Sequence, residues 1–196
     1  MSAGYLVLFA KEPRMGRVKT RLARDIGTVG AWAFYRQSLT RLVRDLGHDP
    51  RWQTVLAVAP DTALAAPCWP ACDLFVPQGQ GGLGERMQRV FDGMPPGPVV
   101  IVGADIPGVE KRHIASAFKA LGRSDAVIGP ADDGGYWLIG LKRRPRIPQI
   151  FDGVRWSGPH AMTDTLQNMR GLDITRLDTL IDVDTGSDLK RLQSKA

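Results

Sequence analysis

Short apolar runs alternate along the chain with segments in which apolar residues recur at helical spacing. An apolar run of about four to eight residues between turn-forming residues is typical of a buried strand, and a longer amphipathic segment is typical of a helix. The expected strands cover residues 4–10, 54–59, 74–76, 98–103, 126–129, 136–141 and 174–177. The expected helices reach to about residue 46 after the first loop and then cover residues 85–93, 110–121, 159–169 and 187–193. This alternation predicts an α/β protein with a mainly parallel sheet.

One pair of expected strands departs from the parallel pattern. Ala126–Gly129 and Tyr136–Leu141 are separated by a tight turn, whereas a parallel crossover needs about a dozen residues. Tyr136–Leu141 is therefore expected to run antiparallel to its neighbour. The chain contains no repeat, low-complexity tract or long linker, so residues 1–196 are expected to form one domain.

The composition of the 196 residues is that of a globular protein and limits the possible partners. No apolar run approaches the roughly 20 residues that a membrane span needs, and the N-terminus lacks the features of a signal peptide. We therefore expect a cytoplasmic protein with no membrane partner and with Cys68 and Cys72 reduced. The net charge is +6, and basic residues concentrate in Lys11–Arg24 and Lys142–Arg146. Glycine and proline interrupt the first cluster, which favours a small phosphate ligand over nucleic acid.

The first expected strand leads directly into the basic loop Leu8–Arg24. Ligands of open α/β sheets bind beyond the carboxyl ends of the strands. A glycine here would let the backbone approach a ligand closely, and the basic side chains would neutralise phosphate charge. The candidate nucleotide-binding residues of the loop are Lys11, Arg14, Gly16, Lys19 and Arg21. The spacing is not that of a Walker loop, and the alternative interpretation is a basic surface turn.

A second candidate loop, Gln78–Met87, contains four glycines in seven positions and leads into a helix. A backbone without side chains can lie against a base or a ribose, so Gly82 and Gly84 are further candidates for nucleotide binding. The alternative interpretation is a flexible connection, because glycine-rich loops often have no ligand.

An aspartate, Asp105, follows the most apolar expected strand and precedes a Pro–Gly break. Mg²⁺ prefers oxygen ligands and commonly takes one or two carboxylates together with the phosphates of a substrate. We interpret Asp105 as a metal ligand, with Asp184 or, alternatively, Asp182 supplying a second carboxylate. Each could instead be a turn-former or a helix cap. Asp188 is expected at the start of the last helix.

The segment Asp132–Gly135 joins two expected strands. Its D-D-G-G sequence suits a hairpin turn by local chemistry alone. The functional hypothesis is that Asp133 faces the acceptor and contributes to catalysis. In that hypothesis the adjacent Tyr136 and Trp137 form a wall of the acceptor site.

These segments, in this order, resemble the glycosyltransferase-A fold of nucleotide-diphospho-sugar transferases. The stretch RMGRVK resembles the R-M-G-x-x-K signature of molybdenum-cofactor guanylyltransferases and sugar-nucleotide synthetases, and VGADIPG resembles their G-x-D-x-P metal motif. AKEPRMGRVKTRLA, LGERM, GADIPG, GPADDGGYWLIGL and DVDTGSDL together are most similar to one bacterial group. That group is the radical-SAM/selenodomain-associated transferases, also described as arsenosugar-biosynthesis glycosyltransferases.

The resemblance implies a three-layer α/β/α fold with a mixed, mostly parallel sheet, a nucleotide donor and Mg²⁺ or Mn²⁺. Lys19 and Arg14 match the phosphate-binding loop, Asp105 matches the metal aspartate, and Asp184 or Asp182 matches the late acidic residue. The loop departs from the nucleotidyltransferase pattern at Ala10–Lys11, where relatives usually have paired glycines.

Three functions fit these residues. The first expectation is glycosyl transfer from a nucleotide sugar to a small-molecule acceptor, with the metal and Lys19 stabilising the departing diphosphate. The alternative is nucleotidyl transfer, in which a phosphorylated acceptor attacks a nucleoside triphosphate and pyrophosphate leaves. A non-enzymatic alternative is a nucleotide- or nucleic-acid-binding module. The sequence leaves the base, the sugar and the acceptor open.

Overall fold

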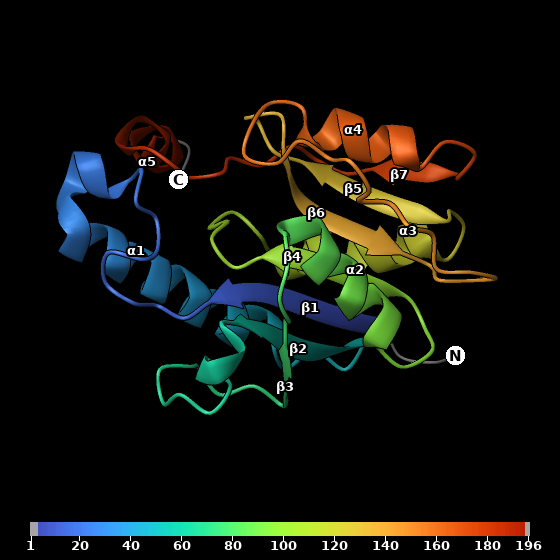
Figure 1. Ribbon diagram of the computed structural model, residues 1–196, viewed down its shortest axis with the longest axis horizontal. Helices are drawn as coiled ribbons and strands as arrows, with labels where there is room; N and C mark the ends of the chain where they lie inside the picture. The colour runs from blue at the N-terminus through green and yellow to red at the C-terminus, as the bar shows by residue number, and fades with distance from the viewer. Residues whose placement is uncertain (1–3, 195–196) are drawn as a thin grey trace.

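The computed structural model describes residues 4–194, which form a seven-stranded sheet with helices on both faces (Figure 1). The strands are β1 (Gly4–Lys11), β2 (Trp52–Ala59), β3 (Leu74–Pro77), β4 (Val99–Gly103), β5 (Ala126–Pro130), β6 (Tyr136–Leu141) and β7 (Ile174–Arg176). The helices are α1 (Ala23–Leu46), α2 (Leu83–Gly93), α3 (Lys111–Leu121), α4 (Ala161–Asn168) and α5 (Gly186–Gln193), and a 3₁₀ turn covers Asp61–Ala63. Within residues 4–194, no helix is both long and apolar enough to cross a membrane.

The order of the strands in the sheet is β3-β2-β1-β4-β6-β5-β7. β1 pairs in parallel with β2 and β4, and β5 pairs in parallel with β7. β6 lies between β4 and β5 and is antiparallel to both, so the expected mixed, mostly parallel sheet is confirmed. Because β6 runs in the opposite direction, it begins at the edge where β1 and β4 end. Tyr136 therefore starts β6 beside the carboxyl ends of the parallel strands.

Different helices cover the two faces of the sheet, because successive strand residues point to opposite sides. Leu6 and Leu8 of β1 pack on the face covered by α1 and α3. Val7, between them, packs on the face covered by α2, α4 and residues 147–156. The protein thus has the expected three layers, with α2 in front of the sheet in Figure 1.

The helix α5 packs beside the start of α1 and not on the sheet (Figure 1). Val183, just ahead of α5, packs with Leu22 and Ala31. The backbone N–H of Gly186 donates to the Asp25 carboxylate at 2.7 Å. These contacts bring the acidic segment that precedes α5 next to the basic loop that follows β1.

Candidate functional site

The carboxyl ends of β1 and β4 open into a cavity of about 660 Å³. Its walls include the basic loop, the start of α2, β6 and the segment ahead of α4. A second cavity of about 400 Å³ is bordered by residues 59–61 and 79–81. Because Lys11, Arg17 and Arg86 line both cavities, the two cavities adjoin, and we refer to them together as the cleft. The cleft lies at the sheet edge where open α/β sheets bind ligands.

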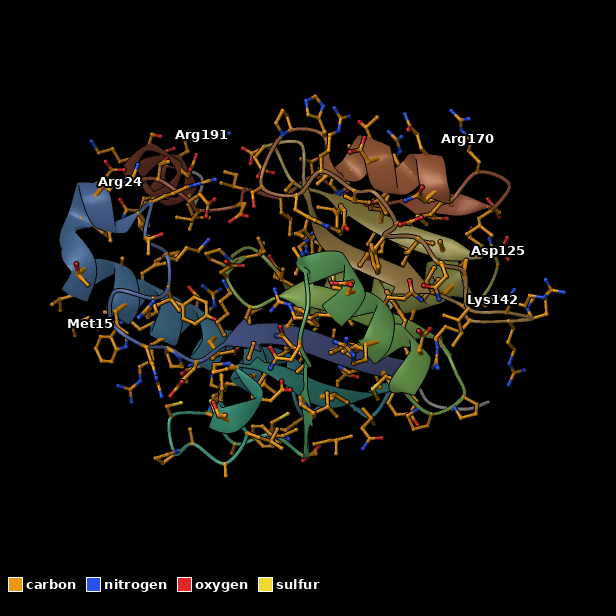
Figure 2. All side chains as sticks on the ribbon, in the orientation of Figure 1. Met15, Arg24, Asp125, Lys142, Arg170 and Arg191 are labelled. Atoms are coloured by element: carbon orange, nitrogen blue, oxygen red, sulfur yellow. The ribbon has the colours of Figure 1, made fainter. Side chains whose placement is uncertain are left out.

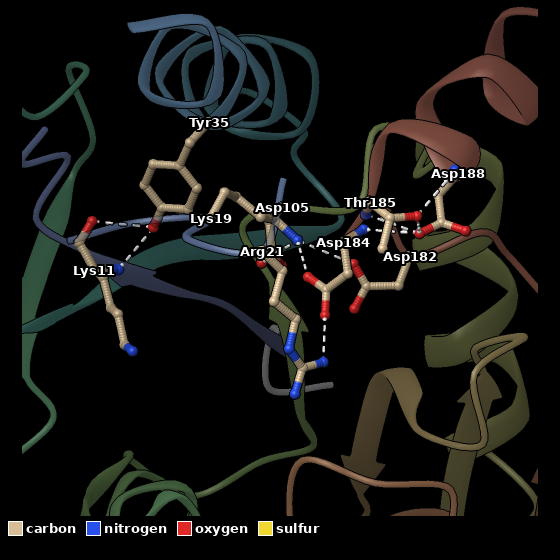
Figure 3. A network of polar contacts seen from close by, with 9 residues as sticks. All are labelled: Lys11, Lys19, Arg21, Tyr35, Asp105, Asp182, Asp184, Thr185 and Asp188. Carbon is tan, nitrogen blue, oxygen red and sulfur yellow. Dashed lines mark hydrogen bonds and ion pairs between the residues drawn. The ribbon is translucent and has the colours of Figure 1, made fainter. Parts of the chain in front are cut away.

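At one end of the larger cavity, three aspartates surround the side chain of Lys19 (Figure 3). The ammonium Nζ lies 2.9 Å from Oδ2 of Asp105, 3.1 Å from Oδ1 of Asp182 and 2.9 Å from Oδ1 of Asp184. Asp105 follows β4, and the other two precede α5, so three distant parts of the chain meet at one ammonium. The Lys19 side chain is only 4% exposed. We call these four residues the carboxylate cluster.

Local structure holds both sides of the carboxylate cluster. Lys19 has a left-handed backbone with φ of 45°, a conformation that residues other than glycine adopt rarely and that is frequent at functional sites. Asp184 accepts a hydrogen bond from Arg21 at 3.2 Å, and its backbone N–H donates to Asp188 at 3.3 Å. Asp188 also exchanges hydrogen bonds with Thr185, which closes a capping box at the start of α5. The expected place of Asp188 at the helix start is confirmed.

The carboxylates of the cluster outnumber its ammonium. Burial and the negative charges of Asp105 and Asp184 raise the pKa of Asp182 to about 7, although Lys19 acts in the opposite direction. Burial alone would lower the pKa of Lys19, but the three carboxylates together outweigh burial and raise it. Lys19 is therefore protonated at neutral pH, and its single charge leaves the cluster with excess negative charge. Such a cluster attracts a cation of higher charge.

The oxygen donors of the cluster match the ligand chemistry of a hard divalent cation. Mg²⁺ binds oxygen at about 2.0–2.1 Å, whereas the carboxylate oxygens lie 2.9–3.1 Å from the central ammonium. Among residues 4–194, no three His, Cys, Asp or Glu side chains already have the spacing of metal ligands. The donor set therefore fits Mg²⁺ or Mn²⁺ in charge and chemistry, and the oxygens would close in by about 1 Å around such an ion.

Two buried side chains that the sequence analysis did not single out hold the strand ends beneath the cleft. The Tyr35 hydroxyl accepts a hydrogen bond from the Lys11 N–H at 2.8 Å and donates to the Lys11 carbonyl at 3.0 Å. The amide of Gln78 donates to carbonyls of β1 and β2, both at 2.9 Å, and its oxygen accepts from Arg86 at 2.8 Å. The sequence signal for Gln78 was a polar residue between an apolar strand and the glycine loop. Tyr35 carried no signal, because its partner lies 24 residues away.

Three basic side chains of the cleft form no ion pair among the residues that the structure describes: Lys11, Arg17 and Arg86. Burial and the nearby charge of Arg89 lower the pKa of Arg86. A partly buried guanidinium without a carboxylate favours an anionic ligand, because it offers several fixed donors. Arg17 and Arg86 were not among the residues selected from the sequence.

The other predicted cations already have carboxylate partners. Arg14 lies 2.7 Å from Glu12 and borders only the smaller cavity. Arg21 pairs with Asp184, and Lys19 is held by all three aspartates. The structure therefore brings Lys19, Arg21, Asp105, Asp182 and Asp184 together at one end of the cleft. Lys11 lines both cavities, and Arg14 lines only the smaller one.

The candidate glycines lie at the margin of the cleft or outside it. Gly16 has a φ of 76° at an exposed turn and lines neither cavity, so its freedom serves the turn. Gly82 precedes α2 and donates its N–H to Glu85 at 2.6 Å. Gly79 and Gly81 line the smaller cavity instead, with φ of 78° and 103°. The glycine loop thus borders the cleft through these two residues and not through Gly82 or Gly84.

Gly84 has a packing role that predicts the effect of a larger side chain. A Cβ at this buried position would lie 2.8 Å from Cβ of Phe151 and 3.0 Å from Cζ2 of Trp156. Gly84→Ala is expected to lower the free energy of unfolding by about 1–3 kcal/mol because of overpacking. Gly93→Ala, at the end of the same helix with no atom within 4 Å of the new Cβ, is the matched control and should be neutral or stabilising. Urea unfolding of the two variants measures the difference, and equal stabilities would contradict the packing role.

One part of the lining of the larger cavity, contributed by α2, β6 and the segment ahead of α4, is apolar. We call it the aromatic end, and its residues are Leu83, Met87, Tyr136, Ile139, Trp156 and Pro159. The Tyr136 and Trp156 rings meet edge to face, with centroids 6.3 Å apart and planes at 71°. Trp156 also packs on Phe151 at 5.9 Å, which fixes its ring from the other side.

Of the two aromatic residues expected to form an acceptor wall, Trp137 borders the larger cavity, but its ring does not face the same side of the sheet as the ring of Tyr136. Neighbouring strand residues point to opposite faces, so only one of the two rings can face this side of the sheet. The Trp137 side chain is buried on the α3 side, packs on His113 at 5.6 Å and donates to the Asp178 carbonyl at 3.0 Å. The aromatic partner of Tyr136 is Trp156, which lies 20 residues farther along the chain.

The D-D-G-G turn forms part of the rim of the larger cavity. Asp133 is exposed, lines the cavity and accepts a hydrogen bond from the Gly135 N–H at 2.9 Å, so it is also the turn-former that the local sequence predicts. Gly134 has a φ of 90°, and a Cβ there would lie 2.6 Å from the Pro159 backbone. Gly134, the first glycine of the turn, thus allows the turn to pack against the segment ahead of α4. Asp132 points away and pairs with Arg191 at 2.6 Å.

Curated proteins with sequence similarity to the chain are 2-phospho-L-lactate guanylyltransferases. The protein of Methanocaldococcus sp. (strain FS406-22) is 29% identical over 108 residues, which are 55% of this chain and 47% of that protein. The protein of Methanocaldococcus jannaschii is 28% identical over 108 residues, or 48% of its length. The chain therefore spans about half the length of the curated relatives that it matches.

Solved structures show the same fold. A protein from Desulfovibrio desulfuricans G20, described as a nucleotide-diphospho-sugar transferase, is 32% identical, with a TM-score of 0.87 over 98% of this chain and 87% of that chain. The 4-diphosphocytidyl-2C-methyl-D-erythritol synthase of Anaerococcus prevotii shares the fold at 11% identity and a TM-score of 0.63, over 98% of this chain and 95% of that one. Rv0371c of Mycobacterium tuberculosis, with a TM-score of 0.57 at 18% identity over 98% of both chains, has been solved with manganese.

The fold is thus that of the nucleotide-diphospho-sugar transferases, as the sequence motifs indicated. The curated relatives establish a distant homology to guanylyltransferases. Residues 42–158 match the family described as "Uncharacterized protein conserved in bacteria (DUF2064)". This match extends over more than half of the chain, and the chain belongs to the DUF2064 family.

Proposed function

We propose that the chain is a nucleotidyltransferase that depends on Mg²⁺ or Mn²⁺. In the proposed reaction, a phosphate oxygen of the acceptor forms a bond to the α-phosphorus of a nucleoside triphosphate. The bond between that phosphorus and its bridging oxygen breaks, and pyrophosphate leaves with the electron pair. The observation that carries the proposal is that an acidic cluster lies at the strand ends beside three cations that form no ion pair within residues 4–194.

In this proposal the cations of the cleft bind the triphosphate. Lys11, Arg17 and Arg86 contact the phosphates, and the smaller cavity holds the nucleoside against Gly79 and Gly81. The three aspartates hold the divalent cation, which would neutralise charge on the phosphates. Such a reaction is accelerated by positioning the two substrates and by neutralising the charge on their phosphates, and it needs no protein nucleophile.

Lys19 has two positions in this proposal. An ammonium and a divalent cation cannot both occupy the centre of the carboxylate cluster, because like charges at that distance repel strongly. In the absence of the divalent cation, Lys19 holds the carboxylates together. With a divalent cation held by the three aspartates, the Lys19 side chain would lie in the adjoining cavity, where its ammonium would contact the phosphates. This would unite the phosphate role expected for Lys19 with the metal role expected for Asp105 and Asp184 or Asp182.

Glycosyl transfer is the second candidate function. It was the first expectation from the sequence, and the 32% identical structure described as a nucleotide-diphospho-sugar transferase supports it. The curated relatives support nucleotidyl transfer instead, since they are named as guanylyltransferases. We also propose that residues 1–196 act as one domain and that the chain is one of the radical-SAM/selenodomain-associated transferases.

The released product separates the two functions. The protein is incubated with Mg²⁺, a panel of sugar phosphates and simple sugars, and either GTP or a GDP-sugar. We expect pyrophosphate from GTP in the presence of a phosphorylated acceptor, measured through added pyrophosphatase. Release of GDP from the GDP-sugar, without pyrophosphate from GTP, would replace the proposal with glycosyl transfer.

Arg86 provides a test of the anion-binding part of the cleft. Arg86→Ala is expected to weaken binding of Mg²⁺–GTP by about tenfold or more, because a charge-assisted hydrogen bond contributes about 1.5–3 kcal/mol. It should weaken guanosine binding far less. Arg170→Ala, which removes the same charge from an exposed residue beyond α4 (Figure 2), is the matched control. Calorimetry measures the affinity for both ligands. Equal losses of affinity for the nucleotide and the nucleoside would show that Arg86 does not contact the phosphates.

A further inference from the structure

The aromatic end differs in charge from the remainder of the cleft. Every basic side chain that lines the larger cavity, within residues 4–194, comes from the end of β1, from the loop after it or from α2. The nearest arginine on the segment ahead of α4, Arg155, is engaged by Asp164 through two guanidinium contacts of 2.8 and 2.9 Å. At the rim, Asp133 adds a negative charge. Within residues 4–194, the rim and the segment ahead of α4 therefore offer no unpaired cation to a second anionic group of an acceptor, and the free guanidinium of Arg86 on α2 is the one proposed to bind the nucleotide phosphates.

The aromatic end is also preformed, because neighbouring side chains fix its rings. Trp156 is fixed between Phe151 and Tyr136. The Tyr136 hydroxyl lies 3.4 Å from Oγ1 of Thr165, so its polar tip is turned toward α4. Since both rings are held by their neighbours, they present preformed apolar surfaces to the cavity and need little ordering when a ligand binds.

Hydrogen bonds and packing also fix the rim of the aromatic end. The Gly134 carbonyl accepts a hydrogen bond from the Met162 N–H at 3.2 Å, and Gly134 packs directly on Pro159. Ser157, in the same segment, has a left-handed backbone with φ of 63°. Asp133 is consequently carried at a fixed place beside the aromatic rings. One of its oxygens accepts from the Gly135 N–H, and a carboxylate can accept further hydrogen bonds.

From this geometry we infer that the aromatic end binds an uncharged, hydroxyl-bearing ring of the acceptor, such as a sugar ring. The inference rests on the proposed function, in which the single phosphate of the acceptor faces the carboxylate cluster. Aromatic side chains offer apolar surface to the C–H face of such a ring, and Asp133 accepts hydrogen bonds from its hydroxyls. The substrate class is therefore a sugar phosphate with one anionic group. It differs from 2-phospho-L-lactate, named for the curated relatives, in which a second anionic group lies beside the phosphate.

A matched pair of probes tests the charge preference without metal or nucleotide. Methyl β-D-glucopyranoside and the corresponding methyl glucuronide share one ring and differ by one carboxylate. Saturation-transfer NMR detects the weak binding expected of such fragments. We expect the neutral glycoside to give a signal at least about threefold larger than the glucuronide, since the carboxylate has no partner and faces Asp133. An equal or larger signal from the glucuronide, or no signal from the neutral ring, would overturn the inference.

Two variants locate the binding. Trp156→Ala should reduce the glycoside signal about fivefold, as expected for loss of one aromatic contact, whereas Trp69→Phe, in the loop ahead of β3, should leave it unchanged. Asp133→Lys supplies the missing cation at an exposed position and should reverse the preference in favour of the glucuronide. An unchanged preference in this folded variant would contradict the inference.

The outcome can be separated from that of the proposed function. Calorimetry with Mg²⁺–GTP on Trp156→Ala should show a much smaller loss of affinity than the glycoside signal does, because Trp156 is not among the residues proposed to contact the nucleotide and does not line the smaller cavity. Normal glycoside binding in a protein that does not bind nucleotides would instead reject the nucleotidyltransferase and leave a sugar-ring site.

Discussion

Asp105→Asn is expected to abolish the gain in nucleotide affinity that Mg²⁺ provides. The substitution keeps the shape of the side chain but removes one of the three negative charges around the cluster centre. In the wild type, we expect Mg²⁺ to tighten GTP binding by at least about tenfold, or 1.4 kcal/mol; in the variant, the two affinities should agree within about twofold. Turnover should fall by roughly 10²–10³, the usual cost of removing one preorganised electrostatic contact.

The control for this experiment is Asp132→Asn. Asp132 loses the same charge, but its carboxylate pairs with Arg191 outside the cavity, so GTP binding should stay dependent on Mg²⁺. Asp105 is partly exposed at a strand end, and urea unfolding should therefore confirm that the variant is folded. If a folded Asp105→Asn protein kept the full gain in GTP affinity with Mg²⁺, Asp105 would not be a metal ligand.

Lys19→Met has the opposite expected effect on the metal. Methionine has nearly the volume of the lysine side chain but no charge, so the substitution removes the cation that competes for the cluster centre. Affinity for Mn²⁺ alone should rise by about tenfold or more, because the three partly exposed carboxylates lose their ammonium and a divalent ion would replace its charge. Titration of free Mn²⁺ by electron paramagnetic resonance measures this affinity without any turnover.

The same variant should show a second signature in its stability. Without metal, Lys19→Met leaves three buried or partly buried carboxylates without their ammonium, and the protein should unfold at a lower temperature than the wild type. Mn²⁺ should restore more stability to the variant than to the wild type, since a ligand that binds the native state raises apparent stability. Lower Mn²⁺ affinity in Lys19→Met would mean that the ammonium assists the metal and does not compete with it.

The sequence predicted the sheet well because its strands are buried on both faces. Val99–Gly103 and Gly4–Lys11 are continuous apolar runs, and such runs are recognised without knowledge of tertiary contacts. The short turn after residue 130 was enough to predict the antiparallel direction of β6. Its insertion between β4 and β5 depends on which strands pair across the sheet, and no local pattern in residues 126–141 encodes that choice.

The sequence predicted the charged site residues that lie in loops after strands or before a helix. It did not predict the site residues whose positions depend on tertiary packing. The basic loop and Asp105 were identified from their positions after strands, and the late aspartates from an acidic cluster ahead of the last helix; the structure brings Lys19, Asp105 and these aspartates to one cavity. Trp156 and Arg86 were missed because each owes its place to partners in other elements, such as Phe151 and Gln78. Tyr136 and Trp137 were expected in one wall, but the two-residue period of a strand sends the Trp137 ring to the opposite face.

The central claim is that the carboxylate cluster is a divalent-cation site now held by Lys19. A crystal grown with Mn²⁺ and a guanine nucleotide tests it directly through the anomalous scattering of manganese. We expect one manganese peak among Asp105, Asp182 and Asp184, with the Lys19 ammonium displaced toward the phosphates of the nucleotide. A peak elsewhere in the cleft, or an ammonium that stays between the three carboxylates beside a bound nucleotide, would contradict it.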